Sequence, residues 1–205
     1  MRKITAGLFI SLDGVIEDPQ DWHFPYFNEE MGQAVDGQLG SADTLLLGRK
    51  TYDSFAAAWP EREKAGADDA DFATKLGDAR KIVVSRQELH FTWRNSELLK
   101  GDLIEAVTAL KKEPSTSDIA MSGSVSVVRR LLAAGLLDEL HLLVHPIAVY
   151  KGMRLFEDAD TPLPLKLLSS TTFATGVVHL VYRLDDDAPT GDYNSAKANL
   201  PQSDD

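Results

Sequence analysis

The sequence predicts an α/β fold in which a mainly parallel sheet ends in an antiparallel hairpin. Short apolar runs closed by small residues alternate with helical patterns as far as about residue 145, which is typical of parallel strands joined by helices. Beyond that point two strand patterns follow one another over 165–173 and 177–184, with a turn near Thr175-Gly176. The first pattern predicts the parallel body of the sheet, and the second predicts its antiparallel end.

In the first half of the chain the predicted elements follow hydrophobic spacing. They are a strand over 3–10, a helix over 27–40, a strand over 44–47, a helix over 50–57 and a strand over 81–84. The helix over 50–57 is expected to end before Trp59-Pro60, because proline disfavours the helical conformation in the residue that precedes it. Residues 61–78 are polar and only weakly helical.

The second half continues the alternation before the hairpin. Its predicted elements are a strand over 94–99, a helix over 102–112, a strand over 119–121, a helix over 124–134 and a strand over 139–144. Gly135 follows the helix over 124–134, where a residue with positive φ commonly ends a helix.

Composition and charge narrow the classes of function. The chain has 205 residues, a net charge of −11 and no cysteine, which excludes disulfides and thiolate catalysis. An acidic surface repels nucleic acid and anionic lipid, and no segment approaches the ~20 apolar residues of a membrane span. We therefore expect a cytoplasmic protein with a small-molecule substrate, and neither a nucleic acid nor a membrane as its partner.

The acidic residues are concentrated at the carboxyl end. Residues 185–205 contain six Asp and one Lys, which gives this segment a net charge of −5. Few large apolar residues accompany these charges, a composition typical of a solvated tail. The sequence thus predicts one folded domain over 1–184, followed by an acidic tail over 185–205.

Three strand-to-helix junctions carry small or cationic residues. They are Gly48-Arg49-Lys50-Thr51, Ser85-Arg86 and Ser122-Gly123-Ser124-Val125. In parallel sheets ligands lie at the carboxyl ends of the strands, where free amides at helix starts can hold phosphate oxygens. Each junction alone also fits a capped helix start or a solvated cation. Three together favour a dinucleotide that carries an extra phosphate.

Other candidate groups give weaker signals. Asp13 follows the first strand and precedes Gly14, so its carboxylate either caps a turn or contacts a polar heterocycle. The five histidines show neither HxH nor HxxxH spacing, so no metal site is predicted. No serine lies in a GxSxG motif, which leaves a serine hydrolase without support.

Taken in order, the motifs resemble a known superfamily. They are Ser11-Leu12-Asp13-Gly14-Val15-Ile16, Leu47-Gly48-Arg49-Lys50-Thr51-Tyr52, Val83-Val84-Ser85-Arg86, Ser122-Gly123-Ser124, Leu137-Asp138-Glu139-Leu140-His141-Leu142 and the segment from Pro146 to Phe156. Over roughly residues 2–184 the chain resembles the dihydrofolate reductase-like superfamily. More narrowly, it is similar to stand-alone relatives of the reductase (C-terminal) domain of the bifunctional riboflavin-biosynthesis deaminase/reductase.

The resemblance implies a three-layer α/β/α sandwich, a homodimer and NADPH as cofactor. By motif match, Gly48, Arg49 and Thr51 would line the cofactor phosphates. Ser85 and Arg86 would hold the 2′-phosphate side, while Gly123, Ser124 and Val125 would lie under the pyrophosphate. Asp13 would be the catalytic residue, near the nicotinamide and the substrate.

Three functions remain open at this point. The first is an NADPH-dependent reductase of the riboflavin-biosynthesis type, in which hydride reduces a ribosylaminopyrimidine after it opens to an imine. The second is a dihydrofolate or pterin reductase, with Glu29 or Glu30 contacting the pterin. In either reaction the aromatic loop from Trp22 to Phe27 is expected to cover the substrate ring, unless it packs in the core. The third is a nucleotide- or flavin-binding module that performs no catalysis.

Overall fold

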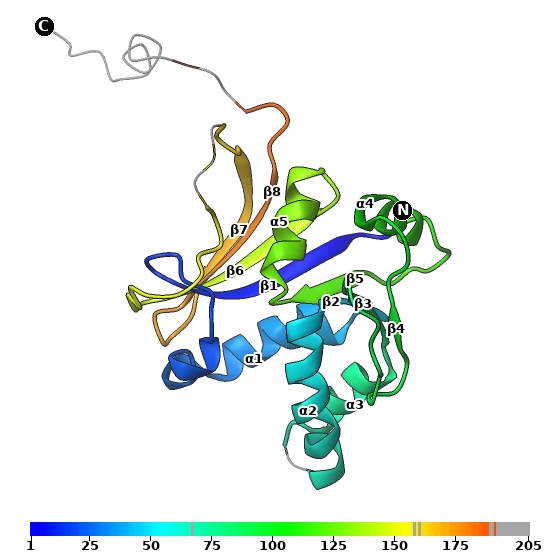
Figure 1. Ribbon diagram of the computed structural model, residues 1–205. Helices are drawn as coiled ribbons and strands as arrows, with labels where there is room; N and C mark the ends of the chain where they lie inside the picture. Colours follow the sequence, from blue (N-terminus) through cyan, green and yellow to red (C-terminus); the bar gives the residue numbers. More distant parts are fainter. Residues whose placement is uncertain (67, 158, 160, 189–190, 192–205) are drawn as a thin grey trace, which may run out of the picture.

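The computed structural model describes residues 1–66, 68–157, 159, 161–188 and 191 (Figure 1). The predicted acidic tail over 185–205 lies almost wholly outside the described residues, so its role stays a prediction.

One eight-stranded sheet forms the centre of the molecule, in the spatial order β4-β3-β2-β5-β1-β6-β8-β7. The strands are β1 (Ile4–Ser11), β2 (Thr44–Gly48), β3 (Arg80–Val84), β4 (Ser96–Leu98), β5 (Ile119–Ser122), β6 (Glu139–His145), β7 (Leu165–Thr172) and β8 (Val178–Leu184). The six strands from β4 to β6 run parallel, whereas β8 is antiparallel to both β6 and β7. This arrangement confirms the predicted mixed sheet with its antiparallel C-terminal hairpin.

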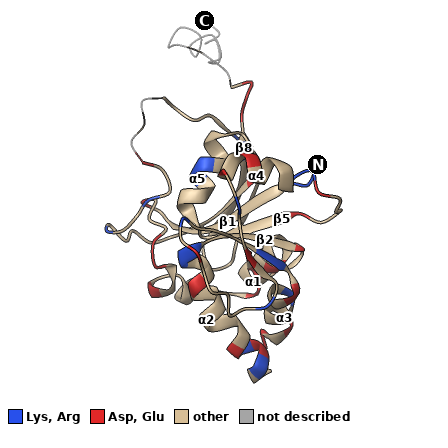
Figure 2. Ribbon diagram, turned by 45° about the vertical axis from the view of Figure 1, so that its right-hand side comes forward, with Lys and Arg blue, Asp and Glu red and all other residues tan. Residues whose placement is uncertain are grey.

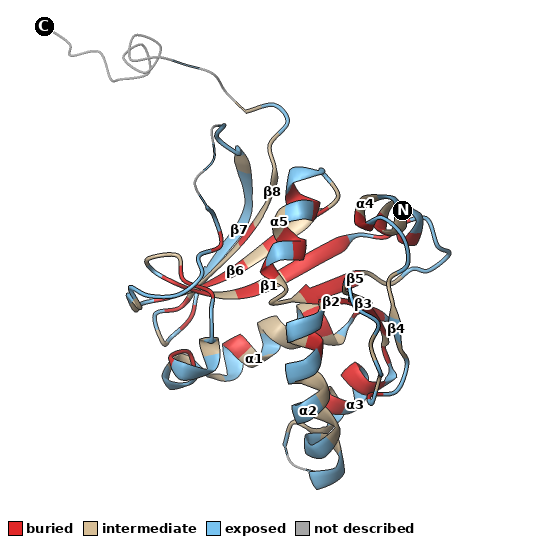
Figure 3. Ribbon diagram, in the orientation of Figure 1, coloured by how far each residue is buried: buried red, intermediate tan, exposed pale blue. Residues whose placement is uncertain are grey.

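Helices cover both faces of the sheet, which gives three layers (Figure 1). The helices are α1 (Glu29–Val35), α2 (Arg49–Ala65), α3 (Ala70–Asp78), α4 (Leu103–Leu110) and α5 (Val125–Ala133). Because side chains alternate along a strand, Leu46 of β2 packs on the side of α4 and α5, while Leu45 and Leu47 pack on the side of α2 and α3. The central strands are buried and β7 is largely exposed (Figure 3).

Helix α2 extends beyond its predicted end. It runs through Pro60 and ends at Ala65, where Gly66, with a φ of +62°, caps the helix. Trp59 packs edge-on against Phe72 of α3 at 5.2 Å between ring centroids, and this contact lies in the turn that contains the proline. A proline inside a helix costs one backbone hydrogen bond. The packing of Trp59 against α3 stabilises the helical conformation at this turn.

The predicted helix over 27–40 is divided into two parts. Helix α1 begins at an Asn28 cap, whose side chain accepts the Met31 amide, and a wider π-helical turn then covers Asp36–Gly40. That turn brings the Gln38 amide against the sheet, where it donates to the Thr5 hydroxyl at 3.0 Å.

Lys81 is a fully buried cation at the start of β3. Its ammonium donates to the carbonyls of Leu76, Gly77 and Ala79 at 2.9, 2.6 and 2.7 Å, and it lies 4.3 Å from the centre of the Trp93 ring. These carbonyls lie at the end of α3, where helix carbonyls otherwise lack partners. Burial lowers the pKa of Lys81 to about 8, so the group remains charged at neutral pH. Lys81 therefore fastens α3 to the sheet.

We predict that Lys81→Met destabilises the protein by about 2–4 kcal/mol, because three buried carbonyls lose a charged donor at once. Chemical denaturation measures this free energy of unfolding. Lys75→Met is the matched control: Lys75 lies on α3, the helix that Lys81 fastens, and forms a half-exposed ion pair with Asp36 at 2.7 Å, a type of pair that contributes less than about 1 kcal/mol. Equal effects of the two substitutions would contradict the assigned role of Lys81.

Candidate functional site

A cavity of about 1600 Å³ opens along the carboxyl ends of the parallel strands. It is larger than the roughly 300–1,000 Å³ of common ligand pockets. Its lining begins at the ends of β2, β3 and β5, crosses the loop after β1 and reaches β6 and β8 under α1. Such a position, where the order of parallel strands reverses, is where open α/β sheets bind ligands.

All eight residues predicted to bind the cofactor line this cavity. They are Gly48, Arg49, Thr51, Ser85, Arg86, Gly123, Ser124 and Val125. They come from the ends of three strands that are neighbours or near neighbours in the sheet, β3, β2 and β5. The structure therefore brings the three predicted junctions together at one surface.

Two of these junctions are joined by side-chain hydrogen bonds. The Ser124 hydroxyl accepts the Gly48 amide at 2.8 Å and donates to the Ser122 carbonyl at 3.2 Å. In return, the Ser124 amide donates to the Thr51 hydroxyl at 3.0 Å. The hydroxyls of Ser124 and Thr51 are thus engaged within the protein. They hold the starts of α2 and α5 side by side, and Ser124 does not cap α5 through its side chain.

The backbone at the start of α5 is shaped to bring its amides to the cavity. Gly123 and Ser124 have φ values of +57° and +53°, a conformation that glycine adopts without strain and serine rarely adopts. A Cβ atom on Gly123 would stand 3.0 Å from the Thr51 hydroxyl, so no larger residue fits there without displacement. The first amides of a helix have no partner within the helix. Small residues at 122–124 leave them accessible to an anion.

Cationic side chains surround these helix starts. The cavity lining includes Arg49, Lys50, Arg86 and Arg130. Arg49 forms an ion pair with Asp53 at 3.1 Å. No ion pair joins the other three to a carboxylate within the part of the chain that the structure describes. Asp102 also lines this end and lies within electrostatic reach of Arg130. In a chain of net charge −11, with acidic and basic residues mixed over α2 and α3 (Figure 2), the four cations still outnumber the carboxylates Asp53 and Asp102 here.

The turn after β3 presents Arg86 to solvent at the edge of the cavity. The Ser85 hydroxyl accepts the Gln87 amide at 3.0 Å, which closes a tight turn directly after the strand. Arg86 is exposed on this turn. The guanidinium is therefore available to a ligand, while the hydroxyl of Ser85 shapes the backbone that carries it.

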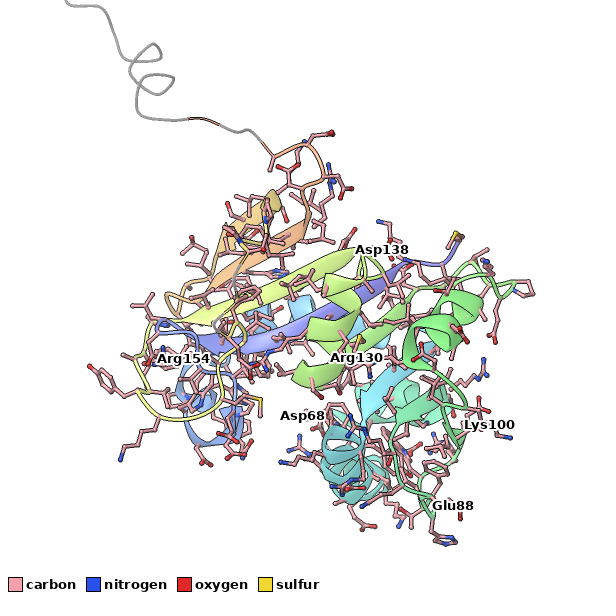
Figure 4. The ribbon with its side chains drawn as sticks, turned by 45° about the horizontal axis from the view of Figure 1, so that its top comes forward. Asp68, Glu88, Lys100, Arg130, Asp138 and Arg154 are labelled. Carbon is pink, nitrogen blue, oxygen red and sulfur yellow. The ribbon has the colours of Figure 1, made fainter. Side chains whose placement is uncertain are left out.

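Asp13 has different partners from those expected. Its carboxylate accepts the Ser11 hydroxyl at 2.6 Å and the amides of Val149 and Tyr150 at 3.0 and 2.8 Å. Hydrogen bonding, first from Ser11 and then from Val149, lowers the pKa of Asp13 to about 2. Arg154, labelled in Figure 4, lies 3.7 Å away. Asp13 is not among the residues that line the cavity, so its position gives no support to the predicted catalytic role.

The two residues predicted to bind substrate also lie outside the cavity lining. Trp22 is only 7 % exposed; its indole N–H donates to the Glu17 carbonyl at 3.2 Å and its ring packs against His145. Glu29 accepts a hydrogen bond from Gln33 at 3.0 Å on the exposed side of α1. Trp22 packs in the core. An aromatic residue in a loop can either pack in this way or cover a ligand, and the sequence alone does not distinguish the two. The position of Glu29 is that of a solvated residue at a helix start.

Sequence reasoning missed several lining residues. Arg130 lies on α5 (Figure 4) and lines the cavity together with Ser126, one helical turn earlier. This i, i+4 spacing on the polar side of α5 was visible in the sequence. His23, Phe24 and Phe27 also line the cavity. They belong to the aromatic loop from Trp22 to Phe27 that is expected to cover the substrate ring, although only Trp22 was predicted to bind substrate. That loop has no periodicity, so no sequence pattern distinguished its inward side chains from Trp22.

Among the described residues, no three His, Asp or Glu side chains are arranged to hold a metal ion. None of the helices in that part of the chain has the length and apolar character needed to cross a bilayer.

Comparison with known proteins gives relatives that match along most of the chain. A protein of Bacillus subtilis (strain 168) described as uncharacterized protein YyaP is 32% identical over 190 residues, covering 88% of this chain and 94% of the relative. A second protein of that organism, uncharacterized protein YwjB, is 25% identical over 187 residues, covering 86% and 95%.

Two crystal structures share the fold. A putative riboflavin biosynthesis protein from Shewanella sp. PV-4 superposes with a TM-score of 0.67 at 19% identity, covering 90% of this chain and 99% of that one. A pyrimidine reductase-like protein from Corynebacterium diphtheriae gives a TM-score of 0.58 at 16% identity, covering 91% and 93%.

The family model for the RibD C-terminal domain matches residues 2–179, a span that includes all three junctions and every parallel strand. It agrees with the resemblance inferred from the order of the motifs. The chain belongs to the RibD C-terminal domain family.

Proposed function

We propose that this protein is an NADPH-dependent reductase that transfers hydride to a pyrimidine or pterin-like small molecule, in a reaction of the riboflavin-biosynthesis type. The observation that carries the proposal is the pair of helix starts joined through Ser124 and Thr51 beside unpaired cations. Membership of the RibD C-terminal domain family and structural likeness to a pyrimidine reductase-like protein support a reductase-like enzyme.

The joined junctions suit a pyrophosphate. The first backbone amides of α2 and α5 can donate hydrogen bonds to an anion, and each helix dipole adds positive potential there. Gly123 lets the start of α5 lie against Thr51 of α2, because a Cβ atom at this position would press on the Thr51 side chain. The residues present therefore fit a dinucleotide, with its phosphates over the ends of β2 and β5.

The turn after β3 suits an additional phosphate. Arg86 lies at the end of the strand next to β2, so a nucleotide held at the β2 junction would extend its adenosine end toward it. A guanidinium binds a phosphate through paired charged hydrogen bonds. This arrangement supports NADPH over NADH, because only NADPH carries a 2′-phosphate.

The other end of the cavity suits the reaction. When bound, NADPH supplies the hydride, so the protein needs only to orient the acceptor and exclude water. Phe24 and Phe27 provide an apolar wall, and Met153 adds to it from the loop after β6. These three side chains come from the region beyond β1, on the opposite side of that strand from the phosphate-binding junctions.

A dihydrofolate-type reaction receives less support. The acids considered for it are engaged elsewhere: Glu29 bonds to Gln33, and Glu30 accepts the Ala174 amide at 2.7 Å. Neither carboxylate lines the cavity. A binding module that performs no catalysis would bind NADPH without oxidising it. Monitoring absorbance near 340 nm with pyrimidine and pterin acceptors separates it from a reductase.

Asp13 acts in this proposal by positioning a loop. It joins the loop after β1 to the loop after β6, and nearby the Ile16 amide donates to the Met153 carbonyl at 2.9 Å. Glu17 and Met153 of these two loops line the cavity. The carboxylate of Asp13 thus acts on the cavity through its neighbours.

We predict that Arg86→Ala weakens NADPH binding by roughly 1.5–3 kcal/mol, the contribution of a charged hydrogen bond, and leaves NADH binding unchanged. Isothermal titration calorimetry with both nucleotides measures the two affinities. Lys112→Ala is the control, because it removes one exposed cation that does not line the cavity. If the wild-type protein binds both nucleotides equally, the assignment of Arg86 fails.

We predict that Asp13→Asn frees the loop at 149–150, because an amide group replaces one of the two acceptor oxygens. Hydrogen exchange at the Val149 and Tyr150 amides should become roughly tenfold faster or more, with a melting temperature a few degrees lower. The folded-state pKa of about 2 lies below the usual value, so the wild type loses this stabilisation as pH falls from about 4 to about 2. The variant should lack that acid-dependent loss. Unchanged stability with abolished turnover would restore the catalytic assignment of Asp13.

A further inference from the structure

Two neighbouring histidines carry buried nitrogens without partners. Among the described residues, four buried side-chain polar atoms have no hydrogen-bond partner, and two of them are His23 Nδ1 and His145 Nε2. Their ring centroids are 6.0 Å apart, with the rings at 88°. A buried polar atom without a partner costs about 1–3 kcal/mol, so two of them in adjacent rings require an explanation.

The orientation of His145 fixes its tautomer. His145 is fully buried at the end of β6, and its Nδ1 lies 2.8 Å from the Leu143 carbonyl oxygen. A carbonyl oxygen only accepts, so Nδ1 carries the hydrogen. Nε2 of His145 is therefore an unprotonated nitrogen that can accept a hydrogen bond and needs a donor.

Tyr26 and His23 both adjoin His145, with ring centroids 5.8 and 6.0 Å away. Of the two, only His23 has a buried atom without a partner, its Nδ1, so we assign the donor to His23. Its ring stacks on Phe9 at 4.4 Å with an interplanar angle of 14°, and Phe24 lies at 4.2 Å on an adjoining side. This packing restricts the ring to its own plane. Neither nitrogen has a direct partner in the structure. A hydrogen on His23 Nδ1 that reaches His145 Nε2 through one bridging water satisfies both buried nitrogens together.

The other ring nitrogen of His23, Nε2, is the one available to the cavity. His23 lines it together with Phe24 and Phe27, and its Nε2 is not among the buried unpartnered atoms. With the hydrogen on Nδ1, Nε2 holds a lone pair. Burial and, to a smaller extent, His145 lower the pKa of His23 to about 4, so this lone pair stays free of a proton at neutral pH.

We propose that His23 is the specificity-determining residue of the substrate end of the cavity, where its Nε2 accepts a hydrogen bond from a ring N–H of a pyrimidinedione-type heterocycle. His145 is a positioning residue that sets the tautomer of His23 through the Leu143 carbonyl. The inference rests on the proposed reductase function and deepens it. His23 and the phosphate-binding junctions lie on opposite sides of β1. On the side of His23, the acceptor ring would meet the nicotinamide.

The tautomers can be measured without any ligand. Long-range ¹H–¹⁵N correlation spectra of the imidazole rings should show the hydrogen on Nδ1 in both His23 and His145. In His145→Phe, which removes the acceptor, His23 should return to the Nε2–H tautomer usual for free histidine. A purely structural role of His145 would not change that tautomer. Finding Nε2–H in wild-type His23 overturns the proposal.

Lumazine, a bicyclic pyrimidinedione, and its 1,3-dimethyl derivative form a matched pair of probes, because methylation removes both ring N–H donors. Fluorescence titration in the presence of saturating NADP⁺ should give lumazine at least about tenfold tighter binding than the dimethyl derivative. In His23→Phe, which keeps an aromatic ring and removes the acceptor, the difference should disappear. Equal binding of the two probes by the wild type, or no lumazine binding at millimolar concentration, contradicts the proposal.

Two further variants locate the accepting atom. The Gln side chain reaches the position of Nε2 with its amide oxygen, whereas the shorter Asn reaches only that of Nδ1. His23→Gln should therefore keep most of the preference for lumazine, and His23→Asn should lose it; the opposite order contradicts the assignment. Both variants should bind NADPH as the wild type does, since His23 lies away from the phosphate-binding junctions. If the wild type does not bind NADPH, the proposed function itself fails, which is a separate result.

Discussion

The site depends on the Ser124 hydroxyl, which joins the ends of two strands that do not follow one another in the chain. By accepting the Gly48 amide, Ser124 fixes the end of β2 against the end of β5, and its own amide is held by Thr51 of α2. The register of the sheet brings these ends together, because β2 and β5 pair at Leu45 and Ala120. Two helix starts are thereby held side by side with their free amides facing the same space.

A second constraint acts on the far side of β1. A series of backbone hydrogen bonds joins the loop after β1 to the loop after β6. At one end the Leu12 amide donates to the Ile147 carbonyl, and at the other the Leu155 amide donates to the Gly14 carbonyl. Asp13 reinforces this set by accepting two amides of the second loop. These bonds hold the two loops together at the border of the cavity, which His23 and Phe24 line.

The sequence was sufficient for the sheet and for the three junctions that meet at one surface of the cavity. Apolar runs such as Leu45-Leu46-Leu47 predict a buried strand, and the small residues after it predict a junction, because both depend on local spacing. The other end could not be predicted, because Asp13-Gly14 looks the same whether its carboxylate faces a ligand or another loop. The distinction depends on Val149 and Tyr150, which are 136 and 137 residues away in the chain. The continuation of α2 through Pro60 likewise depends on packing against α3.

Hydrogen exchange with and without NADPH tests the central claim most directly, because it reports on individual backbone amides. The account predicts that NADPH slows exchange at the first amides of α2 and α5, those of Arg49, Lys50, Val125 and Ser126, since phosphate oxygens would then accept from them. The edge strand β7, which lies at the other side of the sheet, should be unaffected. Binding of NADPH without protection at both helix starts would contradict the assignment of the phosphate-binding junctions.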